Sequence, residues 1–104
     1  MSFITLDSIE KLNGLFEKSK ETPVVLFKHS LTCPISTDAS TQMSIVDGDV
    51  NLVIVQISRD ISNEIEKRTN IRHQSPQVII LKDEKPIYNA SHYDVTAEDL
   101  SKHL

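Results

Sequence analysis

Residues 24–36 read VVLFKHSLTCPIS and contain the only cysteine of the chain, Cys33. The stretch opens with a continuous apolar run, which is typical of a buried strand and predicts one over residues 24–28. Pro34 follows the cysteine, and proline is favoured at the first position of a helix. The stretch therefore predicts a strand, a loop and a helix beginning near Pro34, with Cys33 at the helix N-terminus.

This position gives Cys33 the surroundings of a reactive cysteine. Free backbone N–H groups and the macrodipole at a helix N-terminus favour the thiolate, which is the form that attacks disulfides. Lys28 and His29 are close in sequence, and we expect either to help form the thiolate. Ser36 occupies the position where a dithiol oxidoreductase carries its second cysteine. A monothiol site without an internal disulfide is therefore predicted.

The remaining sequence predicts alternating helices and strands. The expected N-terminal residues of the other helices are Asp7, Asp60 and Thr96. The expected strands after the first cover residues 51–57, 77–82 and 86–91. A strand–helix–strand unit followed by a hairpin implies a right-handed parallel crossover and an antiparallel pair. We therefore expect an α/β fold in which residues 1–104 form a single domain, with a mixed sheet of about four strands flanked by helices.

The composition limits the classes of function. The net charge of −4 argues against a general nucleic-acid binder. No apolar run reaches the roughly 18 residues of a membrane-spanning helix, and no secretory signal is visible, so no membrane partner is expected. One cysteine and four scattered histidines do not form the pattern of a metal site. Because a lone cysteine cannot form an internal disulfide, we expect a cytoplasmic location.

Two separated motifs carry a resemblance to a known family. The first motif consists of Thr32, Cys33, Pro34, Ile35 and Ser36. The second is HQSPQ at residues 73–77, which contains Pro76. At this spacing and with this order of elements, the chain resembles the thioredoxin-like fold. Over almost its full length it looks like the monothiol bacilliredoxins, the YtxJ-like family.

The resemblance implies a thiol–disulfide oxidoreductase. Members of this family are thought to remove bacillithiol, a low-molecular-weight thiol, from mixed disulfides with protein cysteines. Cys33 would be the nucleophile, and Pro76 would follow a cis peptide bond and lie beside it in the substrate groove. The implied partners are bacillithiolated client proteins and bacillithiol itself, which serves as thiol substrate and reductant. We expect no bound cofactor and a monomer.

Further substrate contacts are expected around the two motifs. The backbone of Ser75 is placed to pair with an extended substrate segment by strand addition. Bacillithiol carries carboxylates in its malate portion, and Arg72, His73 and Lys28 are candidates to bind them. His29 is a further candidate residue of the thiol environment. These assignments rest on the spacing of the residues around Cys33 and Pro76.

Other functions on the same fold remain open. A glutathione-linked monothiol glutaredoxin-like protein would differ in the thiol that it accepts. A non-catalytic module would bind a partner through the groove beside Pro76, and a redox sensor would have Cys33 modified and recognised by a partner. Monothiol glutaredoxins that hold iron–sulfur clusters carry a CGFS motif, whereas this chain has Pro34 and Ile35, so no cluster is expected.

Overall fold

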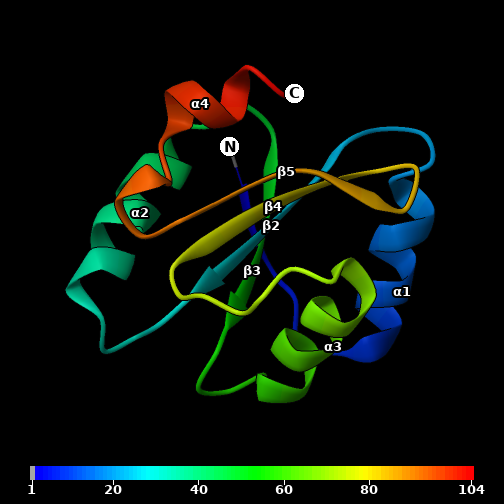
Figure 1. The fold of residues 1–104 in the computed structure, drawn as a ribbon, viewed down its shortest axis with the longest axis horizontal. Coiled ribbons are helices and arrows are strands. Elements are labelled where there is room, and N and C mark those ends of the chain that lie inside the picture. The colour runs from blue at the N-terminus through cyan, green and yellow to red at the C-terminus, as the bar shows by residue number, and fades with distance from the viewer. Residues whose placement is uncertain (1) are drawn as a thin grey trace.

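A five-stranded mixed sheet runs through the middle of the computed structural model, which describes residues 2–104 (Figure 1). The strands are β1 (Ser2–Thr5), β2 (Val24–His29), β3 (Asp49–Ile54), β4 (Gln77–Lys82) and β5 (Lys85–Ser91). Their order across the sheet is β1-β3-β2-β4-β5. β3 is parallel to both β1 and β2, whereas the β2–β4 and β4–β5 pairs are antiparallel. The α/β class is as expected, with one more strand than the sequence predicts.

The additional strand is β1, at an edge of the sheet. All four of its residues are exposed, and it pairs with β3 so that Phe3 lies opposite Val50. The sequence does not predict this strand, because its four residues do not form the longer alternation of apolar and polar side chains that identifies a half-buried strand. β3 also ends earlier than expected, at Ile54, and the exposed Ile57 belongs to the following turn.

Helices cover both faces of the sheet (Figure 1). They are α1 (Ile9–Lys18), α2 (Pro34–Ser44), α3 (Arg59–Thr69) and α4 (Ala97–Ser101), with a 3-10 helix, η1 (His92–Asp94), before α4. α2 and α4 share one hydrophobic core, which includes Phe27 and Met43. α1 and α3 share the other, which includes Leu26 and Ile61. Because successive strand residues face opposite sides, neighbouring residues of β2 point into different cores.

Two of the expected helix starts are wrong by one or two residues. Ser8 is the N-cap of α1, where its side chain accepts a hydrogen bond from the backbone N–H of Lys11. Asp7 instead forms an ion pair with the Lys11 ammonium at 2.8 Å. Ser58 is the N-cap residue of α3. Asp60 lies inside the first turn of that helix, where a negative charge is also favourable.

The register of β2 and β4 brings the two sequence motifs to one end of the sheet. Lys28 near the end of β2 lies opposite Gln77 at the start of β4. The chain therefore leaves β2 towards Cys33 at the same place where it enters β4 from Pro76. This arrangement follows from antiparallel pairing between strands that are almost 50 residues apart in sequence.

Candidate functional site at the start of the second helix

Cys33 is the N-cap residue of α2, with φ −103° and ψ 118°, and Pro34 begins the helix. Its carbonyl accepts hydrogen bonds from the backbone N–H groups of Ser36 at 3.0 Å and Thr37 at 3.3 Å, whereas its side chain makes no capping bond. The partly exposed cysteine borders a shallow hollow of about 440 Å³, which also contacts Asp38. The thiol is thus placed to meet a molecule from solvent.

Ser36 provides no second thiol, but its hydroxyl group makes a structural contact. It is fully buried, and its Oγ accepts a hydrogen bond from the backbone N–H of Ser30 at 3.2 Å. Because Ser30 directly follows β2, this bond ties the end of that strand to the first turn of α2. The hydroxyl therefore helps to fix the loop that carries Cys33.

Pro76 lies at the same end of the sheet. The Ser75–Pro76 peptide bond is cis, as the resemblance implied. Pro76 is buried, and its carbonyl accepts a hydrogen bond from the backbone N–H of His92 at 2.9 Å, which links the turn to η1. Since Lys28 pairs with Gln77, the next residues towards this end are His29 and Pro76. The Pro76 turn therefore borders the strand end from which the Cys33 loop leaves.

Ser75 lies between α3 and β4 and directly precedes Pro76. Among residues 2–104, no hydrogen bond outside the regular elements uses the N–H or carbonyl of Ser75. Its side-chain Oγ is buried and also lacks a partner within that part of the chain. Strand addition of a substrate segment to the Ser75 backbone stays a prediction.

Lys28, a candidate to bind a substrate carboxylate, is buried in the structure. Its side chain is 1% exposed, and its Nζ donates to the carbonyl of Ser62 at 3.0 Å and to Nδ1 of His73 at 3.2 Å. Burial lowers the pKa of Lys28 to about 8. The side chain lies on the α3 face of the sheet, whereas Cys33 begins a helix on the other face. Because its ammonium is enclosed by protein, Lys28 is not placed to contact a substrate carboxylate directly.

His29 lies on the face that α2 covers. Its ring centroid is 5.8 Å from that of Phe27, and its Nδ1 is buried without a partner among the described residues. Burial lowers the pKa of His29. The neutral imidazole is thus favoured, and a role of His29 in the environment of the Cys33 thiol stays a prediction.

Arg72 and His73 lie together in the segment between α3 and Pro76. The Arg72 side chain is exposed, so its guanidinium can reach an anion in solvent. His73 is half-buried, and its pKa is lowered first by burial and then by the charge of Lys28. The two side chains therefore differ in charge and in freedom. Arg72 has an exposed positive charge, whereas His73 has a half-buried ring that is held in place and neutral.

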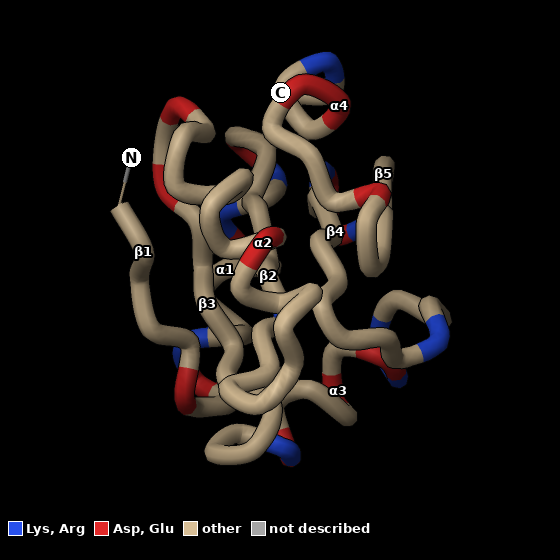
Figure 2. The backbone as a smooth tube through the Cα atoms, turned by 90° about the vertical axis from the view of Figure 1, so that its left-hand side faces the viewer, with Lys and Arg blue, Asp and Glu red and all other residues tan. Residues whose placement is uncertain are grey.

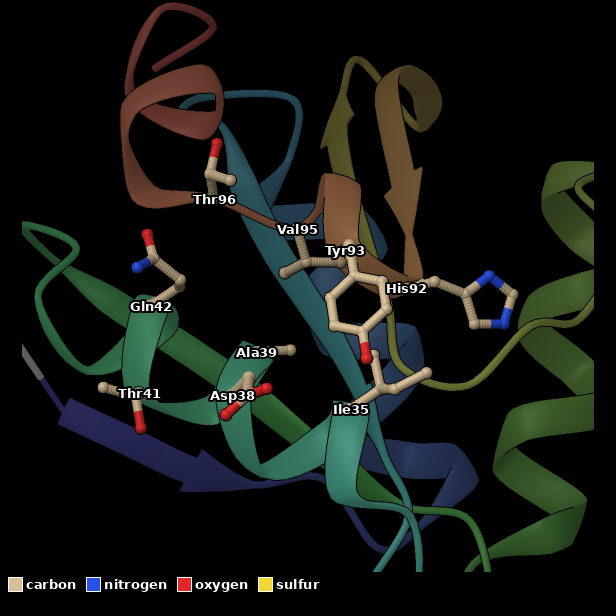
Figure 3. A pocket seen from close by; sticks show the side chains of 9 residues that line it. All are labelled: Ile35, Asp38, Ala39, Thr41, Gln42, His92, Tyr93, Val95 and Thr96. Atoms are coloured by element: carbon tan, nitrogen blue, oxygen red, sulfur yellow. The ribbon is translucent and has the colours of Figure 1, made fainter.

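A second cavity of about 350 Å³ lies between α2 and the segment containing η1 (Figure 3). Asp38 borders both this cavity and the hollow at Cys33. Figure 3 shows the Tyr93 ring standing over the cavity near Ile35 and Asp38. Its lining residues are Ile35, Asp38, Ala39, Thr41, Gln42, His92, Tyr93, Val95 and Thr96. Sequence reasoning missed this cavity because its two walls lie about 50 residues apart.

Charge is sparse on the helix that carries the site. Asp38 is the single charged residue of α2. Most of the tube near the α2 label in Figure 2 is accordingly tan. Within residues 2–104, no helix is both long and apolar enough to cross a membrane. The same part of the chain has no cluster of three or more histidine, cysteine, aspartate or glutamate residues arranged to hold a metal ion.

Comparison with known proteins supports both the fold and the motifs. Residues 4–100 match the model of the family "Monothiol bacilliredoxin BrxC". A solved structure reported as a candidate oxidoreductase with a thioredoxin fold is 36% identical, with a TM-score of 0.89, covering 96% of this chain and 91% of that one. Schistosoma mansoni thioredoxin is 16% identical with a TM-score of 0.71, covering 99% of this chain and 95% of that one.

Fasciola hepatica thioredoxin is 14% identical with a TM-score of 0.72, covering 96% of this chain and 94% of that one. At these low identities the two thioredoxins establish the fold alone. The family match, by contrast, extends over nearly the whole chain and includes both the Cys33 and the Pro76 motifs. The protein therefore belongs to the monothiol bacilliredoxin family of thioredoxin-fold thiol oxidoreductases.

Proposed function

We propose that this protein removes bacillithiol from mixed disulfides on client proteins, with Cys33 as the nucleophile. The observation that carries the proposal is the partly exposed thiol at the start of α2, without a second cysteine, in a chain of the bacilliredoxin family. Family membership supports bacillithiol as the thiol. A lone thiol suits a reducing cytoplasm, where we place the reaction.

The proposed reaction exchanges one disulfide for another. The Cys33 thiolate attacks the bacillithiol sulfur of the mixed disulfide, so that a Cys33–bacillithiol bond forms as the client–bacillithiol bond breaks. The client leaves as a thiolate and takes a proton from solvent. Because Ser36 has no thiol, a second bacillithiol must attack the bound bacillithiol sulfur. This step releases bacillithiol disulfide and restores the Cys33 thiolate.

The surrounding residues are proposed to hold the two parts of the substrate. The reacting sulfur would lie at the positive end of the α2 dipole. The backbone of Ser75 would pair with an extended client segment, and Arg72 would bind a malate carboxylate of bacillithiol. The cavity beside Ile35 gives room for further parts of either molecule.

Intact mass spectrometry tests the proposal directly. We expect the reduced protein, mixed with a bacillithiolated client peptide, to gain one bacillithiol while the peptide thiol is released. Cys33→Ala should stay unmodified. The same peptide carrying glutathione competes in parallel, and faster transfer from it would favour a glutaredoxin-like function. If Cys33 reacts with a thiol reagent but accepts neither adduct, the exchange reaction is refuted and a binding module is favoured.

Ser36→Cys is expected to turn the persistent adduct into an internal disulfide. Residues three apart at a helix start have Cβ atoms about 5–6 Å apart, close enough to be bridged after a small adjustment. The introduced thiol would attack the Cys33 sulfur and expel bacillithiol. Non-reducing mass spectrometry should then show a protein two hydrogens lighter than its reduced form.

Ser36→Ala is the matched control for this experiment. It should retain the bacillithiol adduct, because it provides no second thiol. It should also lower the free energy of unfolding by about 1–2 kcal/mol, since the buried N–H of Ser30 loses its acceptor. An adduct that persists equally in Ser36→Cys and Ser36→Ala would contradict the proposed geometry.

A further inference from the structure

A buried polar network joins β2, α3 and the segment that leads into Pro76. The ammonium of Lys28 lies 3.0 Å from the carbonyl of Ser62 and 3.2 Å from Nδ1 of His73. The Ser62 hydroxyl is 3.1 Å from the same ring nitrogen. Lys28 and Ser62 are 1% and 2% exposed, so these contacts are shielded from water. A buried lysine is uncommon and calls for a physical role.

Two further contacts hold the same segment in place. Gln77, directly opposite Lys28 in the sheet, donates from Nε2 to the carbonyl of Arg72 at 3.0 Å. The carboxylate of Glu66 on α3 accepts a hydrogen bond from the backbone N–H of His73. Side chains from β2, β4 and α3 therefore converge on two consecutive residues, which lie just before the cis Ser75–Pro76 bond.

The network determines which nitrogen of His73 carries the proton. An ammonium group can only donate hydrogen bonds, so Nδ1 must act as an acceptor and be unprotonated. The proton of the neutral ring then lies on Nε2. Burial, Lys28 and Arg59 lower the pKa of His73, whereas Glu66 raises it, and the net effect favours the neutral ring. Nε2 has no hydrogen-bond partner within residues 2–104 and is not completely buried, so it is open to a partner from outside the chain.

We propose that Lys28 is a positioning residue that holds His73 as a neutral imidazole, whose Nε2–H donates a hydrogen bond to a carboxylate of the low-molecular-weight thiol. The identity of that acceptor rests on the proposed function, whereas the state of His73 does not. Lys28 acts only through His73, since its own ammonium is enclosed. In this arrangement Arg72 contributes a mobile charge, and His73 contributes a donor of fixed direction.

Nitrogen-15 NMR of the His73 side chain in the reduced protein tests the inference without any substrate. The wild type should show the Nε2–H form at neutral pH. Lys28→Met has a similar length but no donor, and it should show mixed ring forms and a higher His73 pKa. Lys28→Arg retains a cation that only donates, and it should restore the Nε2–H form. A wild-type ring protonated on Nδ1, or a signature unchanged in Lys28→Met, would overturn the inference.

Kinetics then test whether the donor matters for the substrate. Lys28→Met should lower kcat/KM for a bacillithiolated peptide by about tenfold, mainly through KM, as expected for one lost hydrogen bond. Exchange with 2-hydroxyethyl disulfide, which has no carboxylate, should be unchanged. Equal losses on both substrates would overturn the assigned role.

The two measurements separate this inference from the proposed function. A wild type that fails to exchange with bacillithiolated peptides defeats the proposed function, and the NMR signature still decides whether Lys28 sets the state of His73. A protein that exchanges normally but has a His73 ring independent of Lys28 keeps its function and loses the inference.

Discussion

Replacing Cys33 with serine is expected to lower kcat/KM for bacillithiol exchange by at least about a thousandfold, to the rate in buffer. A hydroxyl is not ionised at neutral pH and cannot form the disulfide bond on which the proposed reaction depends. Release of the client thiol from a bacillithiolated peptide, followed over time, measures this loss. A variant that retained a substantial rate would show that the sulfur of Cys33 is not the nucleophile.

Replacing Cys33 with serine should leave the stability of the fold almost unchanged. Cys33 is partly exposed and its side chain makes no capping hydrogen bond, so we expect the free energy of unfolding to change by less than about 0.5 kcal/mol. Ser40 lies further along α2, outside both hollows, and Ser40→Ala is the matched control. It should exchange at the wild-type rate, which would assign the loss to the sulfur itself.

The stability of the wild type relative to Lys28→Met is expected to rise by about 3 kcal/mol between pH 8 and 10.5. Burial lowers the pKa of Lys28 from 10.5 to about 8 in the folded protein. Between these values the unfolded chain binds more protons than the folded one, so the free energy of unfolding increases with pH. Below pH 8 the ammonium is charged in both states, and the full cost of burying it is present.

Urea denaturation of both proteins at a series of pH values measures this difference. Groups other than Lys28 titrate in both proteins, so their contributions largely cancel when the two stability curves are subtracted. Lys28→Met should lack the rise above pH 8. Parallel curves over the whole range would show that Lys28 keeps an ordinary pKa, and hence that the ammonium is not enclosed in solution.

Much of the fold can be predicted from short stretches of the sequence. The apolar run before Lys28 predicts β2, and Pro34 predicts the start of α2. The strand over residues 77–82 has the predicted bounds, because Gln77 and Lys82 both flank a continuous apolar run. β1 has no such signal, since its pairing with β3 is decided by residues about 50 positions away. An exposed edge strand is thus invisible to reasoning from periodicity.

The residues of the candidate site also fall into two groups: those that short motifs identify and those whose role depends on contacts between distant parts of the chain. Cys33 and Pro76 lie in short motifs, so the sequence alone singles them out, although their catalytic and groove roles stay proposals. The role of Lys28 depends on a contact with His73, 45 residues away, and on the sheet register that aims the side chain at α3. Lysine is seldom buried, so the sequence alone does not indicate that the Lys28 ammonium is enclosed.

The position of β2 in the sheet has a consequence for how the molecule opens. β2 is hydrogen-bonded to β3 on one side and β4 on the other, whereas Cys33 lies beyond its end. Amides of such interior strands exchange with solvent only when the whole protein unfolds, while loop amides exchange through local openings. Lys28 therefore belongs to the slowest-exchanging part of the chain. A docking protein can reshape the loop around the thiol while the strand beneath it remains intact.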